Sequence, residues 1–178
     1  MDTYFSTITV ALVVLNASTI LLYYRSNYVF REMIMQRQIS QVLIVPYSAE
    51  QMYDLVADID SYPEFIPHCV QASRLVIKKN SIRGQLVFSW MGMHFTLVTH
   101  NVCCPPSSIE LELVKGPLHD LQGTWRFTPL PHNRCEVSFM VNLTLHSWQS
   151  FILVPSMLEL MPKTVVQVFV NRAKYLHG

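Results

Sequence analysis

The chain has 178 residues, of which 51% are hydrophobic and 14% are charged, and its formal net charge is +1. This length suits one domain with a core of its own, and the composition excludes extended disorder and collagen-like repeats. A net charge so close to zero gives no global basic field of the kind that attracts nucleic acid.

The first predicted element is an uncharged stretch, residues 3–24. A helix over it would be about 33 Å long, enough to cross a bilayer core of about 30 Å. Tyrosines lie at and just after the end of the stretch and arginines follow it, so by the positive-inside rule the rest of the chain stays cytoplasmic. We therefore expect residues 1–34 to be a membrane anchor and linker that tethers a cytoplasmic domain to the inner membrane. Two alternatives stay open: translation that begins at Met33 or Met35, and a targeting peptide.

Residues 35–178 have the pattern of a compact domain, which opens with a predicted strand over residues 39–45. Ser48 and Gln51 have the spacing of a capping box, so a helix is expected to start at Ser48. A second short helix is predicted over residues 60–66, with Pro67 ending it. Because no Lys or Arg lies among them, the carboxylates of this region are interpreted as a solvated face. They are Glu50, Asp54, Asp58, Asp60 and Glu64.

Six further strands are predicted, each bounded by turn residues. They cover residues 70–78, 81–90, 93–103, 108–115, 122–130 and 134–145. Apart from Met140, the last strand alternates between apolar and polar residues, which is typical of an antiparallel sheet with one exposed face.

Apolar residues at spacings of three and four predict a terminal helix over residues 148–175, which Pro155 and Pro162 would kink or divide. Since no other element remains to cover the sheet, the sequence predicts an α+β helix-grip fold. In that fold a curved seven-stranded antiparallel sheet surrounds a long C-terminal helix.

The chain contains no catalytic or metal-binding motif that we recognise. The seven histidines are scattered, and the four cysteines form no C-x-x-C pair. Cys103 and Cys104 are adjacent, so they are expected to point to opposite faces of a strand. We therefore predict a binding protein that has no catalytic residues, no metal site and no required cofactor.

Bulky apolar residues at inward positions either fill a core or line a cavity, and the pattern alone leaves both open. Apolar walls suit an isoprenoid tail, because each buried CH₂ contributes about 0.8 kcal/mol. The candidate cavity residues are Phe65, Ile66, Phe88, Trp90, Phe95, Leu97, Trp125, Phe127, Leu158, Met161, Val165 and Phe169.

A second candidate site is basic. Four residues cluster around one predicted hairpin tip and have the charge to contact rRNA phosphates, namely Arg74, Lys78, Lys79 and Arg83. An ordinary polar hairpin tip would carry the same residue types, and no RNA-binding motif accompanies them.

Several segments taken together resemble the START-like coenzyme Q-binding family. They are residues 45–53 (VPYSAEQMY), 60–67 (DSYPEFIP), 116–118 (GPL), 123–130 (GTWRFTPL), and Phe169 with Arg172-Ala173-Lys174. Residues 116–118 and 123–130 match the bacterial branch of ribosome-association toxins, the RatA branch, better than the mitochondrial branch. The resemblance covers about residues 35–176; residues 1–34 and Pro162 depart from the bacterial pattern.

The resemblance implies a START-like domain that binds ubiquinone or another polyprenyl quinone or apolar lipid. Through the RatA branch it implies a factor that binds the large (50S) ribosomal subunit, blocks subunit association and so translation, and has a small antitoxin as partner. The alternative is a coenzyme Q-binding chaperone or transport protein that supports respiratory electron transfer; a cyclase-type or hydrolase enzyme is less favoured. A membrane anchor favours the quinone role, and the bacterial-type motifs favour the ribosomal role.

Overall fold

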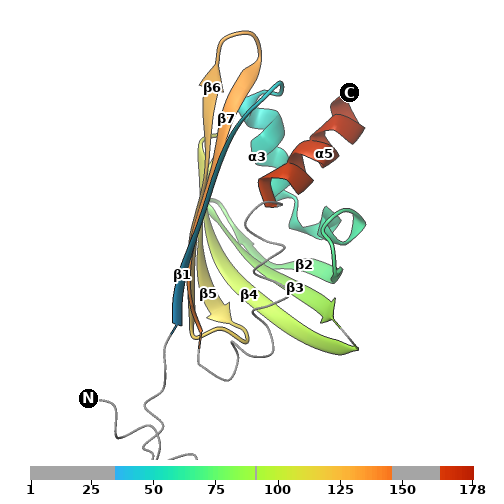
Figure 1. The fold of residues 1–178 in the computed structure, drawn as a ribbon, viewed down its shortest axis with the longest axis vertical. Coiled ribbons are helices and arrows are strands. Elements are labelled where there is room, and N and C mark those ends of the chain that lie inside the picture. The colour runs from blue at the N-terminus through green and yellow to red at the C-terminus, as the bar shows by residue number, and fades with distance from the viewer. Residues whose placement is uncertain (1–34, 91, 146–164) are drawn as a thin grey trace, which may run out of the picture. The chain divides into compact units, whose positions relative to one another are not determined.

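The computed structural model describes residues 35–90, 92–145 and 165–178, which all belong to one compact unit. Seven strands form one antiparallel sheet in the order β1-β7-β6-β5-β4-β3-β2. The strands are β1 (Met35–Val45), β2 (Cys69–Lys78), β3 (Ser81–Trp90), β4 (Met93–Cys104), β5 (Ser108–Lys115), β6 (Asp120–Leu130) and β7 (Arg134–Leu145). The predicted curved seven-stranded sheet is confirmed, and Figure 1 shows it from the side.

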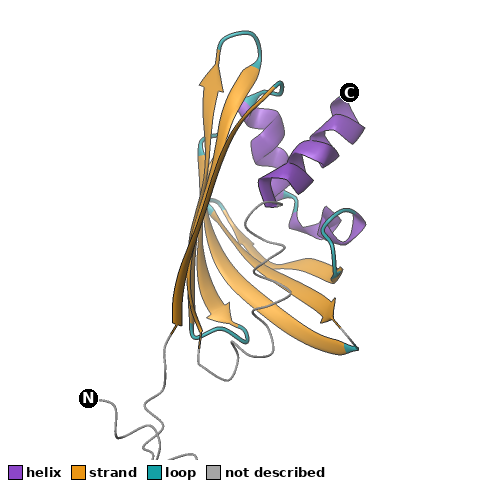
Figure 2. Ribbon diagram, viewed as in Figure 1, coloured by secondary structure: helices purple, strands orange, loops and turns teal. Residues whose placement is uncertain are grey.

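The three described helices lie on one side of this sheet (Figure 2). They are α3 (Ala49–Ala57), the 3-10 helix η1 (Ile59–Glu64) and α5 (Val165–His177). Within the described ranges, none of the helices has both the length and the apolarity that a membrane span requires. The anchor predicted for residues 3–24 lies outside those ranges, as do Pro155, Pro162 and residues 146–164 of the predicted terminal helix.

Helix α3 begins where the capping box predicts. The backbone N–H of Gln51 donates to Ser48 Oγ at 3.2 Å, and the backbone N–H of Ser48 donates to Gln51 Oε1 at 2.8 Å. These two bonds satisfy backbone donors that a helix start leaves unpaired. The buried residues of α3, among them Met52 and Val56, belong to the hydrophobic core.

The alternation predicted for the last strand is confirmed, because every second residue of β7 from Cys135 to Leu145 is buried. Strand β1 is longer than predicted: it begins at Met35 rather than residue 39, since its backbone pairs along the whole of β7, from Met35 opposite Leu145 to Val45 opposite Cys135. The pattern of apolar and polar residues did not reveal the additional residues of β1, because backbone pairing between strands needs no apolar side chain.

The four cysteines are free thiols, and Cys103 is buried while its neighbour Cys104 is exposed, as predicted for opposite faces of a strand. Burial raises the pKa of the Cys69 and Cys103 thiols, and raises that of Cys135 to about 11. These three thiols are therefore protonated at neutral pH and are poor nucleophiles.

Candidate ligand cavity

A cavity of about 300 Å³ lies between the concave face of the sheet, η1 and the beginning of α5. Its wall is contributed by η1 and the residues that follow it, by strands β3 to β7, and by α5. The apolar wall residues are Ile59, Ile66, Pro67, Leu86, Phe88, Phe95, Leu97, Leu111, Leu121, Trp125, Phe139, Val141, Leu143, Val165, Val168 and Phe169. Such a wall offers apolar contact to a ligand on several sides.

Close approach of η1 to the sheet depends on Gly84 of β3, which also lines the cavity. A Cβ atom at this position would lie 2.6 Å from Cδ1 of Ile59, a distance at which real atoms overlap. Ile59 is itself only 4% exposed, so its side chain has little room to move away. Glycine at residue 84 therefore lets η1 form one side of the cavity.

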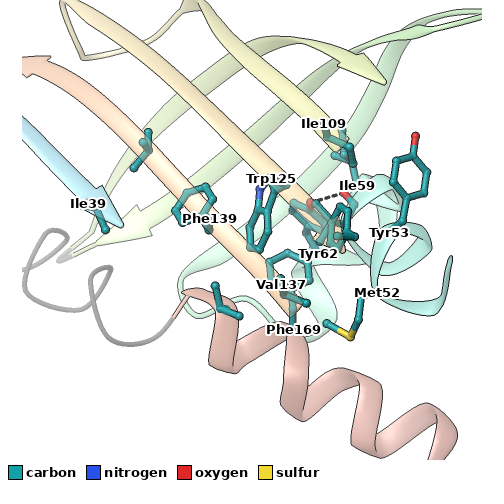
Figure 3. Packing of buried hydrophobic residues seen from close by; sticks show 14 of the residues in the cluster. Ile39, Met52, Tyr53, Ile59, Tyr62, Ile109, Trp125, Val137, Phe139 and Phe169 are labelled. Atoms are coloured by element: carbon teal, nitrogen blue, oxygen red, sulfur yellow. Dashed lines mark hydrogen bonds between the residues drawn. The ribbon is translucent and has the colours of Figure 1, made fainter. Parts of the chain in front are cut away.

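Aromatic rings join α5 to the opposite wall (Figure 3). The ring of Phe169 lies 5.2 Å from Trp125 and 5.5 Å from Tyr62, in edge-to-face contacts. Trp125 in turn lies 4.4 Å from Phe139. Tyr62 donates its hydroxyl proton to the backbone carbonyl of Val56 at 2.6 Å, and its burial, together with the charge of Asp58, raises its pKa well above the ordinary value. Tyr62 is thus a neutral structural donor rather than an acid.

Two polar residues interrupt the apolar wall at consecutive inward positions of β4. Thr99 is 9% exposed and Asn101 is 7% exposed, and they are the buried polar residues of the described chain. Both line the cavity. Asn101 Oδ1 is buried without any hydrogen-bond partner, which costs about 1–3 kcal/mol in a folded protein.

The structure brings seven of the predicted cavity residues to the cavity wall. They are Ile66, Phe88, Phe95, Leu97, Trp125, Val165 and Phe169. Leu158 and Met161 lie outside the described residues, and so does the side chain of Trp90, the last residue of β3.

Two predicted cavity residues are not on the wall. Phe127 is 2% exposed and packs in the core, with its ring 5.8 Å from Tyr53 of α3. Phe65 packs 5.3 Å from the ring of Phe169, and the guanidinium of Arg172 lies 5.2 Å from its centroid. Inward direction alone does not distinguish a ring that fills the core from one that reaches the cavity.

The sequence-based choice of candidates omitted the polar wall residues, because it selected for apolar bulk. Thr99 and Asn101 lie two residues apart between Leu97 and Cys103, so all four share one face of the predicted strand and the inward direction of the polar pair was readable from the alternation. Two polar residues at inward positions of a strand were therefore the sequence signal that could have identified the polar part of the wall.

The four basic residues predicted at one hairpin tip have different surroundings. Lys78 and Lys79 are exposed at the β2–β3 turn, and Arg83 is exposed opposite Val76. Arg74 lies farther along β2 and pairs with Asp60 of η1, where Nε donates to Oδ2 at 2.6 Å and the backbone N–H donates to Oδ1 at 2.9 Å.

The acidic residues are solvent-exposed as interpreted, with side chains of Asp58, Asp60 and Glu64 that are 48%, 46% and 61% exposed, but these three also form ion pairs that the sequence did not predict. Asp60 and Asp58 both contact Arg74, the latter at 3.7 Å. Glu64 forms an ion pair with Arg172 of α5. These contacts join residues far apart in the sequence, so inspection of neighbouring residues could not reveal them. They connect η1 to β2 and to α5.

Comparison with known proteins shows similarity at the level of sequence to a family model and to several relatives. Residues 45–172 match the family model described as polyketide cyclase/dehydrase and lipid transport. The ribosome association toxin RatA of Escherichia coli K12 is 33% identical over 152 residues, which cover 85% of this chain and 96% of that protein. The mitochondrial coenzyme Q-binding protein COQ10 homolog B of Xenopus laevis is 27% identical over 143 residues, covering 78% of this chain and 59% of that protein.

Solved structures share the fold at lower identity. The Zhui aromatase/cyclase from Streptomyces sp. R1128 superposes with a TM-score of 0.68 at 15% identity, covering 79% of this chain and 94% of that chain. A START superfamily protein from Mycobacterium smegmatis superposes with a TM-score of 0.61 at 17% identity, covering 78% and 98%. These likenesses show that the fold is START-like.

Proposed function

The chain belongs to the polyketide cyclase/dehydrase and lipid transport family, and we propose that it is a non-enzymatic binding protein that holds a polyprenyl quinone or a similar apolar lipid. The observation that carries this proposal is the cavity of about 300 Å³ with its predominantly apolar wall. Burial of an isoprenoid or acyl chain against such a wall is favourable by about 25 cal/mol per Å² of apolar surface.

The proposal of a binding role without catalysis is supported by the chemistry of the wall. General acid–base catalysis needs a group that changes protonation near neutral pH. The hydroxyl of Tyr62 is committed to the Val56 carbonyl and is held protonated. His68 is the one residue of the described wall whose side-chain type changes protonation near neutral pH, and no carboxylate, thiol or amine lies among the described wall residues to act with it. Thr99 and Asn101 do not ionise near neutral pH. Their chemistry suits recognition of a ligand rather than proton transfer.

The experiment that tests this function is identification of the lipid that co-purifies with the protein. Protein purified without detergent is extracted with organic solvent, and the extract is analysed by mass spectrometry. We expect a polyprenyl quinone, such as ubiquinone, in a fixed molar ratio to protein. Absence of any apolar molecule from the extract, together with no binding of added short-chain ubiquinone, would contradict the proposal.

A second candidate function is association with the large ribosomal subunit, blocking subunit joining and translation. It is supported by the RatA relative, which is named for ribosome association. The match covers 96% of that protein. The exposed cations Lys78, Lys79 and Arg83 provide a surface for rRNA phosphates, whereas Arg74 is engaged with Asp60. A small antitoxin partner belongs to this second function. The alternative to this ribosomal function is a role as a chaperone or transport protein for coenzyme Q in respiration, which the COQ10 relative supports.

Charge reversal at the β2–β3 hairpin is expected to remove ribosome association. The variant Lys78→Glu/Lys79→Glu/Arg83→Glu loses three phosphate contacts, and wild-type binding through three contacts should weaken roughly 20- to 40-fold between 50 and 200 mM salt. The measurement is co-sedimentation with large subunits in sucrose gradients at both salt concentrations.

The control is Lys115→Glu/Arg126→Glu/Arg134→Glu, which makes the same change in net charge at exposed positions of β5, β6 and β7. This variant should sediment as wild type does. If wild-type protein never travels with the large subunit, even at low salt, the ribosomal function is wrong and the coenzyme Q role stands alone.

Residues 3–24 are proposed to tether the domain to the inner membrane, on the strength of their uncharged sequence. We expect full-length protein to fractionate with membranes and to resist carbonate extraction, because a spanning helix is released only by detergent. Protein that starts at Met35 should be found in the soluble fraction. Recovery of the full-length chain in that fraction, or a mature N-terminus at Met33 or Met35, would contradict the tether.

A further inference from the structure

The cavity reaches the protein surface at one corner of the sheet, where the turn after η1 meets the β3–β4 hairpin. Within the described wall, Pro67 and His68 of that turn are the residues that are exposed. The backbone carbonyl of His68 accepts a hydrogen bond from the N–H of Ser89 at 2.9 Å, which joins the turn to the last residues of β3. The opening of the cavity and the tip of the hairpin are therefore neighbours.

The β3–β4 hairpin projects beyond the strands on either side of it. Strand β4 pairs with β3 from Met93 onward, but with β5 only from Val98 onward. On the other side, the pairing of β2 with β3 stops at Phe88. Figure 1 shows the hairpin reaching past the end of β5. Among the described strands, the tip of the hairpin thus has no neighbour on either side, which leaves it available to an external surface.

The residue types at the hairpin tip suit a lipid surface. Met93 is 50% exposed and lies two residues before the wall residue Phe95, on the same face of β4. Trp90 is opposite Met93 in the strand register, and tryptophan is enriched where proteins meet the membrane interface. Apolar and aromatic residues therefore occupy the tip, next to the opening of an apolar cavity.

The sequence of both parts of this corner lacks formal charge. Residues 65–73 and 84–109 contain no Asp, Glu, Lys or Arg, whereas the β2–β3 turn at the opposite end of β3 is flanked by Lys78, Lys79 and Arg83. A nucleic acid requires cationic side chains at its contact surface, and a charged protein requires complementary charge. An uncharged tip instead fits the acyl-chain boundary of a bilayer, which charged side chains enter only at high cost.

We propose that the tip of the β3–β4 hairpin docks the domain on the surface of a lipid bilayer, with the cavity opening toward the lipid. This role rests on the proposed function, because a polyprenyl quinone or a similar lipid resides in the bilayer and has to pass from there into the cavity. Docking at the opening keeps the apolar ligand out of water during the transfer. The tether proposed for residues 3–24 would hold the chain near a membrane but would not orient the cavity.

The test is hydrogen–deuterium exchange of the full chain, with and without vesicles of phosphatidylcholine, a lipid without net charge. We expect the vesicles to slow exchange by about tenfold or more at residues 67–69 and 92–97, because the bilayer covers the edge of β4 that β5 does not reach. The β2–β3 turn should exchange as it does without vesicles. Since exchange is measured peptide by peptide, protection of residues 1–34 does not affect this result.

Met93→Glu places a carboxylate at the tip and is expected to reduce the protection by vesicles to less than about twofold. Met140→Glu is the matched control, because Met140 is 43% exposed on β7 and receives the same side chain; it should keep the wild-type protection. Neither methionine lines the cavity. Decylubiquinone added without vesicles should therefore bind both variants as it binds wild type, as measured by isothermal titration calorimetry.

An unprotected tip in wild-type protein overturns the docking role, and so does equal protection of a folded Met93→Glu variant. Protection that appears only when anionic phosphatidylglycerol is added also overturns it, since basic residues would then make the contact. If wild-type protein binds no decylubiquinone although its tip is protected, the proposed function is wrong while the contact with the bilayer stands. The wild-type measurement is decisive by itself, so the role stays falsifiable even if Met93→Glu fails to fold.

Discussion

Replacing Leu97 with lysine is expected to abolish lipid binding, with a loss of affinity of more than roughly 100-fold. Leu97 belongs to the cavity wall on β4 and is half-buried. An ammonium group there would either stay charged against apolar side chains or turn into the cavity and bring water with it. Both outcomes remove the apolar contact that holds a lipid chain. The measurement is the amount of co-purified lipid per protein, with circular dichroism as the check on folding.

Val102→Lys is the matched control, because Val102 lies on the opposite face of the same strand and is 40% exposed. Its ammonium group would reach water, and lipid content should match wild type. If Leu97→Lys fails to fold, Val165→Phe provides a second variant, since it reduces the cavity without adding charge. Its control is Val170→Phe on the same helix, at a half-buried position away from the wall. Unchanged lipid content in Val165→Phe and in a folded Leu97→Lys would place the ligand elsewhere.

Replacing Phe169 with alanine is expected to lower the free energy of unfolding by about 3–5 kcal/mol. Phe169 is 2% exposed and its ring contacts Tyr62, Phe65 and Trp125. Removing the ring leaves a void next to an existing cavity and breaks the aromatic contact between α5 and the sheet. For a domain of this size the melting temperature should fall by roughly 10 °C or more.

Lys174→Ala on the same helix is the control for that measurement. Lys174 is exposed, so the change should stay within about 0.5 kcal/mol of wild type. A loss of less than about 1 kcal/mol in Phe169→Ala would mean that α5 contributes little to the stability of the domain. The ring contacts described above would then be poor guides to its energetics.

Local signals predicted most of the fold. Turn residues and period-2 alternation placed the strands within a few residues of their observed bounds, because both depend only on near neighbours. The capping box at Ser48 is likewise a local device, and it gave the start of α3. Strand alternation also gave the inward face of the four strand residues among the seven candidates on the wall, namely Phe88, Phe95, Leu97 and Trp125.

The remaining features depend on contacts between distant residues. The pairing of Arg74 with Asp60 and of Arg172 with Glu64 requires η1 to lie between β2 and α5. Whether a ring such as Phe127 fills the core or faces the cavity is decided by how closely α3 approaches the sheet. The unpaired oxygen of Asn101 depends on two apolar neighbours in other strands. None of these contacts between distant residues can be read from the alternation of apolar and polar residues along the sequence.

The position of β1 at the edge of the sheet has a consequence for the newly made chain. In the described sheet β1 pairs with β7 alone, yet it ends at Val45 while β7 begins at Arg134. At a synthesis rate of about 5–20 residues per second, β1 is made several seconds before its pairing partner. Its run Val42-Leu43-Ile44-Val45 has the β-propensity and lack of charge that promote intermolecular strand pairing. During translation this segment therefore has no strand partner in its own sheet until β7 has been made.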